Sequence, residues 1–176
     1  LGRGEREQES PLLRASRAQK RDIVQPALVQ ALRSGGNSDF QVFALHALAK
    51  LREVPFDESL GDFLTFCRPL LRSGNQTVSE KAVLALGIRG EDRYLPLLVS
   101  ILRDMPAGRE EIGRSRVGPR LRTFAAYGLG LLAERTQDIG VRLRIYDVLV
   151  EALWIERVEV QAACLLALGL TPMPLD

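Results

Sequence analysis

Small and apolar residues recur along this chain in one short pattern, which returns four times. Each copy is six residues long and begins with a small residue. Two variable positions follow, then Ala or Gly, then Leu, and in three of the four copies a final Gly. The copies are residues 44–49, 82–87, 125–130 and 164–169, separated by 38, 43 and 39 residues. With the first small residue as position 0, apolar residues also recur at −4, +1, +3 and +4. This spacing predicts one face of an α-helix and not the alternation of a β-strand.

A second set of amphipathic segments precedes the four copies. These segments are residues 22–33, 62–72, 92–103 and 141–153. The segments at 22–33 and 92–103 each have an Asp able to cap a helix and a Pro four residues later. Gly followed by Asn37 or Asn75 ends the first two segments, which predicts a helix end and a new helix start. Each unit is therefore predicted to be helix A, a tight turn and helix B, with the B helices starting near Asp39, Thr77, Pro119 and Arg157.

A repeat of roughly 40 residues predicts a stack of helix pairs rather than a single closed globule. A four-helix bundle uses the same amphipathic segments but does not produce this internal repeat. A coiled coil needs sustained heptads, which Gly and Pro interrupt here about every 12–15 residues. We therefore expect an all-α, right-handed α-solenoid of about four pairs, or eight principal helices, preceded by a short helix at 11–19.

The repeat also divides the chain. Within a solenoid of residues 11–171, the units lie at about 22–51, 60–89, 92–133 and 141–170, followed by a tail at 172–176. Residues 1–10 are charged and contain Gly, so we expect a flexible segment. Residues 104–118 lengthen the turn of the third unit, and we expect a mobile irregular loop or a recognition loop there.

The four copies resemble HEAT repeats, especially the short bacterial type found in proteins related to phycobilisome lyases, with the pattern V-R-x-x-A-x-x-A-L-G. The copy starting at Leu121-Arg122 matches best, those starting at Val78 and Val160 are next, and the one at Phe40 is weakest. Arg122 alone matches the usual arginine, and Asn residues replace the usual turn acid in the first two units. The resemblance covers about residues 22–171. It implies stacked antiparallel helix pairs, as in armadillo-like proteins, with a concave face of B helices that typically binds proteins.

Charge and composition limit the classes of function. The net charge is only +2, which argues against a strong general binder of polyanions. Cys67 and Cys164 lie in different units among apolar neighbours, so we expect buried thiols and a reducing compartment such as the cytoplasm. No apolar run reaches the roughly 18–20 residues of a membrane span. The first residue is Leu rather than Met, so we expect a fragment, a processed form or a module of a larger protein.

The sequence contains little that points to catalysis. His46 is the only histidine, and no Cys or carboxylate stands at ligand spacing from it, so it predicts packing or surface exposure rather than a metal site. Catalytic mechanisms in which a histidine activates a Ser or Cys nucleophile also lack support, because the chain has this one histidine. No phosphate-binding Gly-rich loop follows a predicted strand. We therefore predict no catalytic residue, no metal ligand and no cofactor.

Candidate partner-binding residues come from two places. Positions −1, +2 and +6 of the B helices share one flank, which either lines the concave groove or packs between repeats. The stretch 109–122 is rich in arginine and faces an acidic partner if it is a recognition loop. The candidates are Phe43, His46, Lys81, Phe124 and Tyr127 on the flank, and Arg109, Arg114, Arg116 and Arg122 in the stretch.

The leading hypothesis is a non-catalytic HEAT-repeat scaffold for protein–protein interaction. The partner is another protein or a second copy, bound by the concave face or by the apolar helix at 158–170. That helix has no charge after Glu159, so it lacks the polar outer face of a terminal repeat. Two alternatives stay open: a nucleic-acid-binding array that uses 109–122, which the near-neutral charge disfavours, and an accessory role resembling bilin-lyase-associated HEAT-like proteins.

Overall fold

The computed structural model describes residues 15–35 and 37–172, and this part of the chain contains helices and no strand. Four A helices alternate with four B helices. The A helices are α2 (Gln25–Arg33), α4 (Phe63–Leu71), α6 (Leu95–Leu102) and α9 (Ile139–Ile155). The B helices are α3 (Ser38–Lys50), α5 (Gln76–Arg89), α8 (Pro119–Arg135) and α10 (Val158–Leu170). The prediction of an α-solenoid is confirmed.

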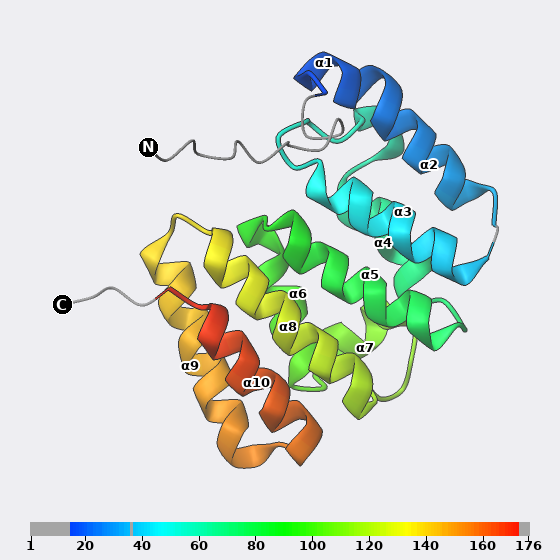
Figure 1. Ribbon diagram of the computed structural model, residues 1–176. Helices are drawn as coiled ribbons and strands as arrows, with labels where there is room; N and C mark the ends of the chain where they lie inside the picture. The colour runs from blue at the N-terminus through cyan, green and yellow to red at the C-terminus, as the bar shows by residue number, and fades with distance from the viewer. Residues whose placement is uncertain (1–14, 36, 173–176) are drawn as a thin grey trace, which may run out of the picture.

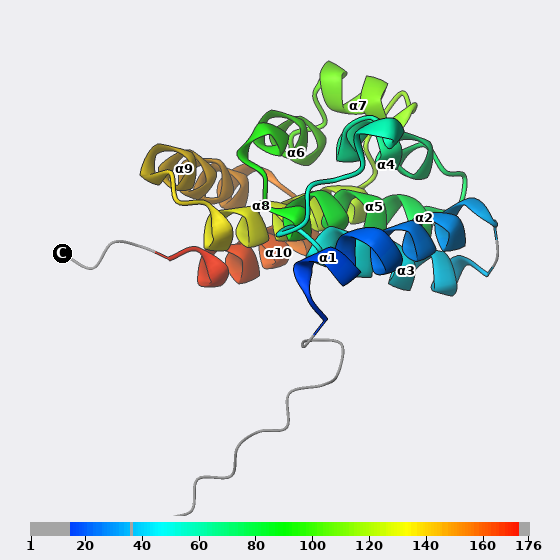
Figure 2. The ribbon, with the colours of Figure 1, turned by 90° about the horizontal axis from the view of Figure 1, so that it is seen from above.

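The B helices form a continuous row. Helix α3 packs on α5, α5 on α8 and α8 on α10, while each A helix packs on the B helix of its own pair (Figure 1). In Figure 2 the A helices α4, α6 and α9 lie on one side of this row. The row itself is curved, because α3 and α10 at its ends project further from the A helices than α5 and α8 do. The exposed face of the B helices is therefore concave.

Small residues set the distance between neighbouring B helices. A Cβ atom added to Gly87 of α5 would lie 2.4 Å from the Cα of Gly128 in α8. A Cβ added to Gly130 would lie 2.7 Å from the Cα of Ala167 in α10. The recurring Gly at position +5 is thus the place where the backbone of the next B helix rests. This contact explains why small residues return with the period of the repeat.

Four helices start with an Asn or Asp cap, of which the sequence predicts those at Asn37 and Asn75, and two other predicted caps are absent. The side chains of Asn37, Asn75, Asp62 and Asp138 accept hydrogen bonds from backbone N–H groups at the starts of α3, α5, α4 and α9. The expected cap at Asp22 is wrong, because a capping box of Ser16 and Gln19 starts the helix earlier. That helix runs through α1 (Arg17–Gln19) and a π-helical turn at Lys20–Val24 into α2.

Asp92 does not cap α6 either, because a 3₁₀ turn at Asp92–Tyr94 precedes that helix. The predicted flexible segment 1–10 lies outside the described residues. So do residues 11–14 of the expected short helix and residues 173–176 of the tail.

The expectation of an irregular loop at 104–118 is wrong. This segment contains helix α7 (Pro106–Ile112), and Ile112 and Val117 are buried. Helix α7 lies directly against α6, because a Cβ added to Gly108 would be 2.6 Å from the carbonyl carbon of Ser100. Arg72, which follows the last residue of α4, donates hydrogen bonds to the carbonyl oxygens of Glu110 and Glu111, both at 3.1 Å. The segment is therefore folded onto the A-helix side of the stack.

Asp104 organises the entry to α7. Its backbone has φ of +54°, a left-handed conformation that ends α6, and Asp is one of the few residues that tolerate it. One carboxylate oxygen lies 2.7 Å from Nε of Arg109 and 2.7 Å from the backbone N of Val117. The hydrogen bond from Arg109 is the main reason why the pKa of Asp104 is lowered. A single side chain thus ties the two ends of the α7 segment together.

The two cysteines are buried free thiols, as the sequence predicts. Burial raises the pKa of both thiols, that of Cys164 to about 11. Neither side chain is therefore poised to act as a thiolate near neutral pH. No helix within residues 15–35 and 37–172 has the length and apolar character needed to cross a bilayer.

Candidate protein-binding surface

The flank of positions −1, +2 and +6 faces the concave side of the B-helix row. Its exposure is uneven along the stack. Phe43 of α3 is 72% exposed, and Leu166 of α10 is 62% exposed. Between them, the side chains of Lys81, Phe124 and Tyr127 are half-buried. The flank therefore combines packing between repeats in its middle with accessible apolar groups at its two ends.

Three residues in the middle of the flank contact one another across two helices. Nζ of Lys81 in α5 lies 4.7 Å above the centre of the Phe124 ring in α8, which is the geometry of a cation–π interaction. Phe124 meets Tyr127 edge to face, with ring centroids 6.0 Å apart. These contacts hold the two aromatic rings and the ammonium group of Lys81 against one another across α5 and α8.

His46 lies next to this group and is held neutral. Burial lowers the pKa of its imidazole, and the nearby charge of Lys81 lowers it further. Its Nε2 atom is buried without a hydrogen-bond partner in the described part of the chain. No cluster of His, Cys, Asp or Glu suited to a metal ion occurs in residues 15–35 and 37–172.

A family model for HEAT repeats matches residues 25–113, about half of the chain. This range contains the first three A helices, the first two B helices and α7. The chain belongs to the HEAT-repeat family. No curated protein and no solved structure matches it. HEAT repeats are typically protein-interaction scaffolds without enzymatic activity.

The candidate arginines of this HEAT-repeat protein lie away from the aromatic flank. Nε of Arg122 donates to the carbonyl oxygen of Leu102 at 2.6 Å, and its guanidinium pairs with Glu156 in a largely buried ion pair. Arg109 pairs with Asp104. Arg114 donates to the carbonyl oxygen of Ser73 at 3.1 Å.

Arg116 differs from the other three arginines, because its side chain is 78% exposed. The structure therefore separates the nine candidates into an aromatic and basic group on the concave face and an arginine group bound mainly to the protein itself.

Sequence reasoning also missed two ion pairs of other arginines. Arg120 of α8 pairs with Glu80 of α5, whose side chain is 2% exposed, and Arg68 of α4 pairs with Glu111 of α7. Each pair joins residues about 40 positions apart in the chain. No local pattern in the sequence marks such pairs, because Glu80 lies at position −2 of its copy, outside the apolar positions −4, 0, +1, +3 and +4.

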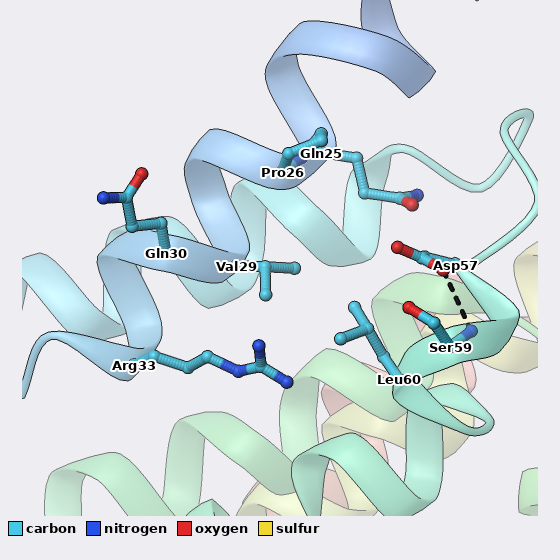
Figure 3. Close-up of a pocket in the computed structure, with 8 residues that line it drawn as sticks. All are labelled: Gln25, Pro26, Val29, Gln30, Arg33, Asp57, Ser59 and Leu60. Atoms are coloured by element: carbon cyan, nitrogen blue, oxygen red, sulfur yellow. Dashed lines mark hydrogen bonds between the residues drawn. The ribbon is translucent and has the colours of Figure 1, made fainter.

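The pockets of the HEAT stack lie off the concave flank. One, of about 320 Å³, opens between α2 and the 3₁₀ turn at Glu58–Leu60 (Figure 3). Gln25, Val29 and Arg33 approach it from α2, and Asp57 accepts a hydrogen bond from the backbone N of Ser59 on the other side. The described lining contains no His or Cys and no pair of facing carboxylates. The cleft combines apolar side chains such as Val29 and Leu60 with polar ones, and Asp57 is the one carboxylate in its lining.

Proposed function

We propose that this HEAT-repeat protein is a non-catalytic scaffold that holds a segment of a partner protein against the concave face of α3, α5, α8 and α10. The residues that carry the proposal are Phe43, His46, Lys81, Phe124 and Tyr127. The main support is the mutual contact of Lys81, Phe124 and Tyr127 next to the exposed ring of Phe43. Exposed aromatic side chains are the groups that most often dominate protein–protein binding.

The side chains on this face indicate which groups a partner segment would present to it. Aromatic and aliphatic groups provide a surface for apolar side chains, while Lys81 and the exposed Lys50 favour an acidic residue on the partner. The Arg-rich stretch adds little to this, because Arg109, Arg114 and Arg122 already have partners within the protein. The same pairing weakens the case for nucleic acid, which binds to accessible cations.

In the test, the wild type and two surface variants are each purified from the native host. The proteins that co-purify with each of the three are then compared. Phe43→Glu alters the concave face, and Met105→Glu alters an exposed apolar side chain on the α6–α7 side. Neither residue is buried, so both variants should keep the wild-type melting temperature. We expect one set of proteins to be lost with Phe43→Glu and retained with Met105→Glu. Equal recovery with all three proteins, measured by quantitative mass spectrometry, contradicts a role for the concave face.

A further inference from the structure

Neighbouring A helices lie further apart than neighbouring B helices. Each B helix packs closely on the next one, whereas α2, α4, α6 and α9 make little contact with one another. The curvature of the stack explains the difference, because helices on the outer side of a curved row are spread apart (Figure 2). The A-helix side therefore has room for other segments between its helices.

The chain itself occupies two of these spaces. Leu60 of the 3₁₀ turn Glu58–Leu60 lines a cavity together with residues of α2 and α4. Helix α7 lies between α4 and α6 on the outer side of the stack (Figure 2). There Ile112 is buried, and Gly108 rests on the backbone of α6. A space between A helices is thus a place where this fold accommodates a short segment of chain.

The space between α6 and α9 is open. It forms a groove of about 460 Å³ with an apolar floor, to which Leu95 and Val99 of α6 and Val148 of α9 contribute. The exposed side chains of Arg144 and Asp147 also line it. Both walls rest on α8, and the lining comes from α6 with its following turn and from α9. No other described segment lies in this groove.

The groove repeats a feature of the site that holds α7. Helices α4 and α6 both end in a leucine that is followed by an arginine, Arg72 or Arg103. Arg72 donates to carbonyl oxygens in the last turn of α7, where a cation is favourable. Arg103 lines the α6–α9 groove and pairs with Glu151. Because this pair is partly exposed, it contributes little, and Arg103 can exchange Glu151 for another acceptor.

One position distinguishes the two sites. Four residues before the arginine, α4 has Arg68 and α6 has Val99. Arg68 pairs with Glu111 of α7, whereas Val99 belongs to the apolar floor of the groove. A segment seated like α7 between α6 and α9 therefore needs an apolar side chain where α7 has Glu111.

We propose that the groove between α6 and α9 binds a short helix of a partner protein, seated as α7 is seated between α4 and α6. The last carbonyl oxygens of that helix lie at Arg103, and its apolar side chains lie between Val99 and Val148. Helices that dock an apolar face into a groove are a common mode of peptide recognition. The groove is on the opposite side of the stack from the concave face, so both sites can be occupied at once (Figure 2).

The probe is a synthetic peptide with the sequence of residues 105–115 and the change Glu111→Leu. A hydrocarbon staple between the exposed positions 107 and 110 holds it helical, because a free peptide of this length is not helical in water. We expect fluorescence anisotropy to show binding at micromolar concentration. Binding should be about 10-fold tighter than that of the stapled peptide that retains Glu111, because the complex buries a Leu side chain.

Two variants of the protein locate the peptide. Val148→Glu and Met105→Glu each place a carboxylate in the groove and should weaken binding by about 10-fold or more. Met105 is 43% exposed, so Met105→Glu should keep the wild-type melting temperature and tests the groove apart from any effect on folding. Leu143→Glu is the matched control, because it makes the same kind of change at an exposed position of α9 outside the groove lining.

A wild-type protein that binds neither peptide overturns the proposal, as does tighter binding of the peptide that retains Glu111. Equal weakening by Leu143→Glu, or loss of binding in Phe43→Glu, places the peptide outside the groove and also overturns it. Peptide binding that persists while the test of the concave face fails refutes only the proposed function.

Discussion

Gly87 and Gly169 occupy the same position in two B helices but have opposite surroundings. At Gly87 the backbone of α8 lies within 2.4 Å of an added Cβ, whereas at Gly169 there is open space. The same amino acid therefore serves close helix packing at one site and leaves a gap at the other. Single residues in this fold have to be interpreted through the helix that lies, or does not lie, beside them.

The first prediction follows from this contrast. Gly87→Ala should push α8 away from α5 and lower the free energy of unfolding by about 1–3 kcal/mol, because the obstacle is backbone that cannot rotate aside. Gly169→Ala should leave it unchanged or raise it slightly. Urea unfolding of dilute protein, followed by circular dichroism, measures both. Equal stability of the two variants contradicts the close contact at Gly87.

The second prediction concerns the buried pair of Arg122 and Glu156, whose side chains are 12% and 9% exposed. Arg122→Met removes one charge and leaves the other buried, so it should cost about 3–5 kcal/mol. The double variant Arg122→Met, Glu156→Leu should recover a large part of this loss, because no unpaired charge remains. A double-mutant cycle with strictly additive losses argues against a direct interaction.

At the scale of elements, α7 shows how one short helix is held by its neighbours. Arg68 of α4, Arg72 just after α4 and Ser100 of α6 contact this segment. Asp104 joins its two ends. A seven-residue helix is too short to be stable alone in water. Its structure therefore depends on these contacts and on the burial of Ile112 and Val117.

The third prediction uses the charge of Asp104. Its pKa is lowered by the hydrogen bond from Arg109, so the folded state favours the ionised carboxylate. The stability it contributes is present above the unfolded pKa of about 3.9 and is lost as pH falls through the lower folded value. Asp104→Asn, which tolerates the same backbone conformation, should destabilise the protein by a constant amount between pH 6 and 8, and by less and less below pH 4.

Urea unfolding at several pH values measures this difference. Asp22→Asn is the control, since Asp22 also pairs with an arginine but lies on the surface, where such pairs contribute little. A difference between wild type and Asp104→Asn that grows in acid contradicts the assignment.

At the scale of the whole molecule, the HEAT stack is held together by contacts between neighbours, so its ends can separate from its middle. Helices α9 and α10 pack on α8 and on each other, with α6 as a minor neighbour. We therefore expect this last pair to be able to unfold before the rest of the stack.

The fourth prediction tests this separation. Ala167→Asp places a charge where α10 touches Gly130 of α8, so the last pair should unfold before the rest. The helical signal, followed by circular dichroism during urea unfolding, should then fall in two steps. Ala162→Asp, an exposed site on the same helix, should keep a single transition in dilute protein. A single transition in Ala167→Asp shows that the stack unfolds as one unit.

The sequence by itself determined the helices, their pairing and the family. These features repeat with a fixed period, and helical periodicity, Asn and Asp caps and small residues at close contacts all act over a few neighbouring positions. The aromatic and basic members of the concave flank, such as Lys81 and Phe124, were also visible, because they share one register with respect to the small residues. That they bind a partner remains our proposal.

Only the tertiary structure decided what the arginines do, how α7 folds and which end of the stack is open. Arg122 and Arg120 find their carboxylates on helices that are distant in the chain, and α7 is helical because α4 and α6 support it. Gly169 has the same local sequence context as Gly87 and Gly130, yet it alone lacks a described neighbour. Contacts between distant segments depend on the arrangement of whole helices, so no local pattern along the chain encodes them.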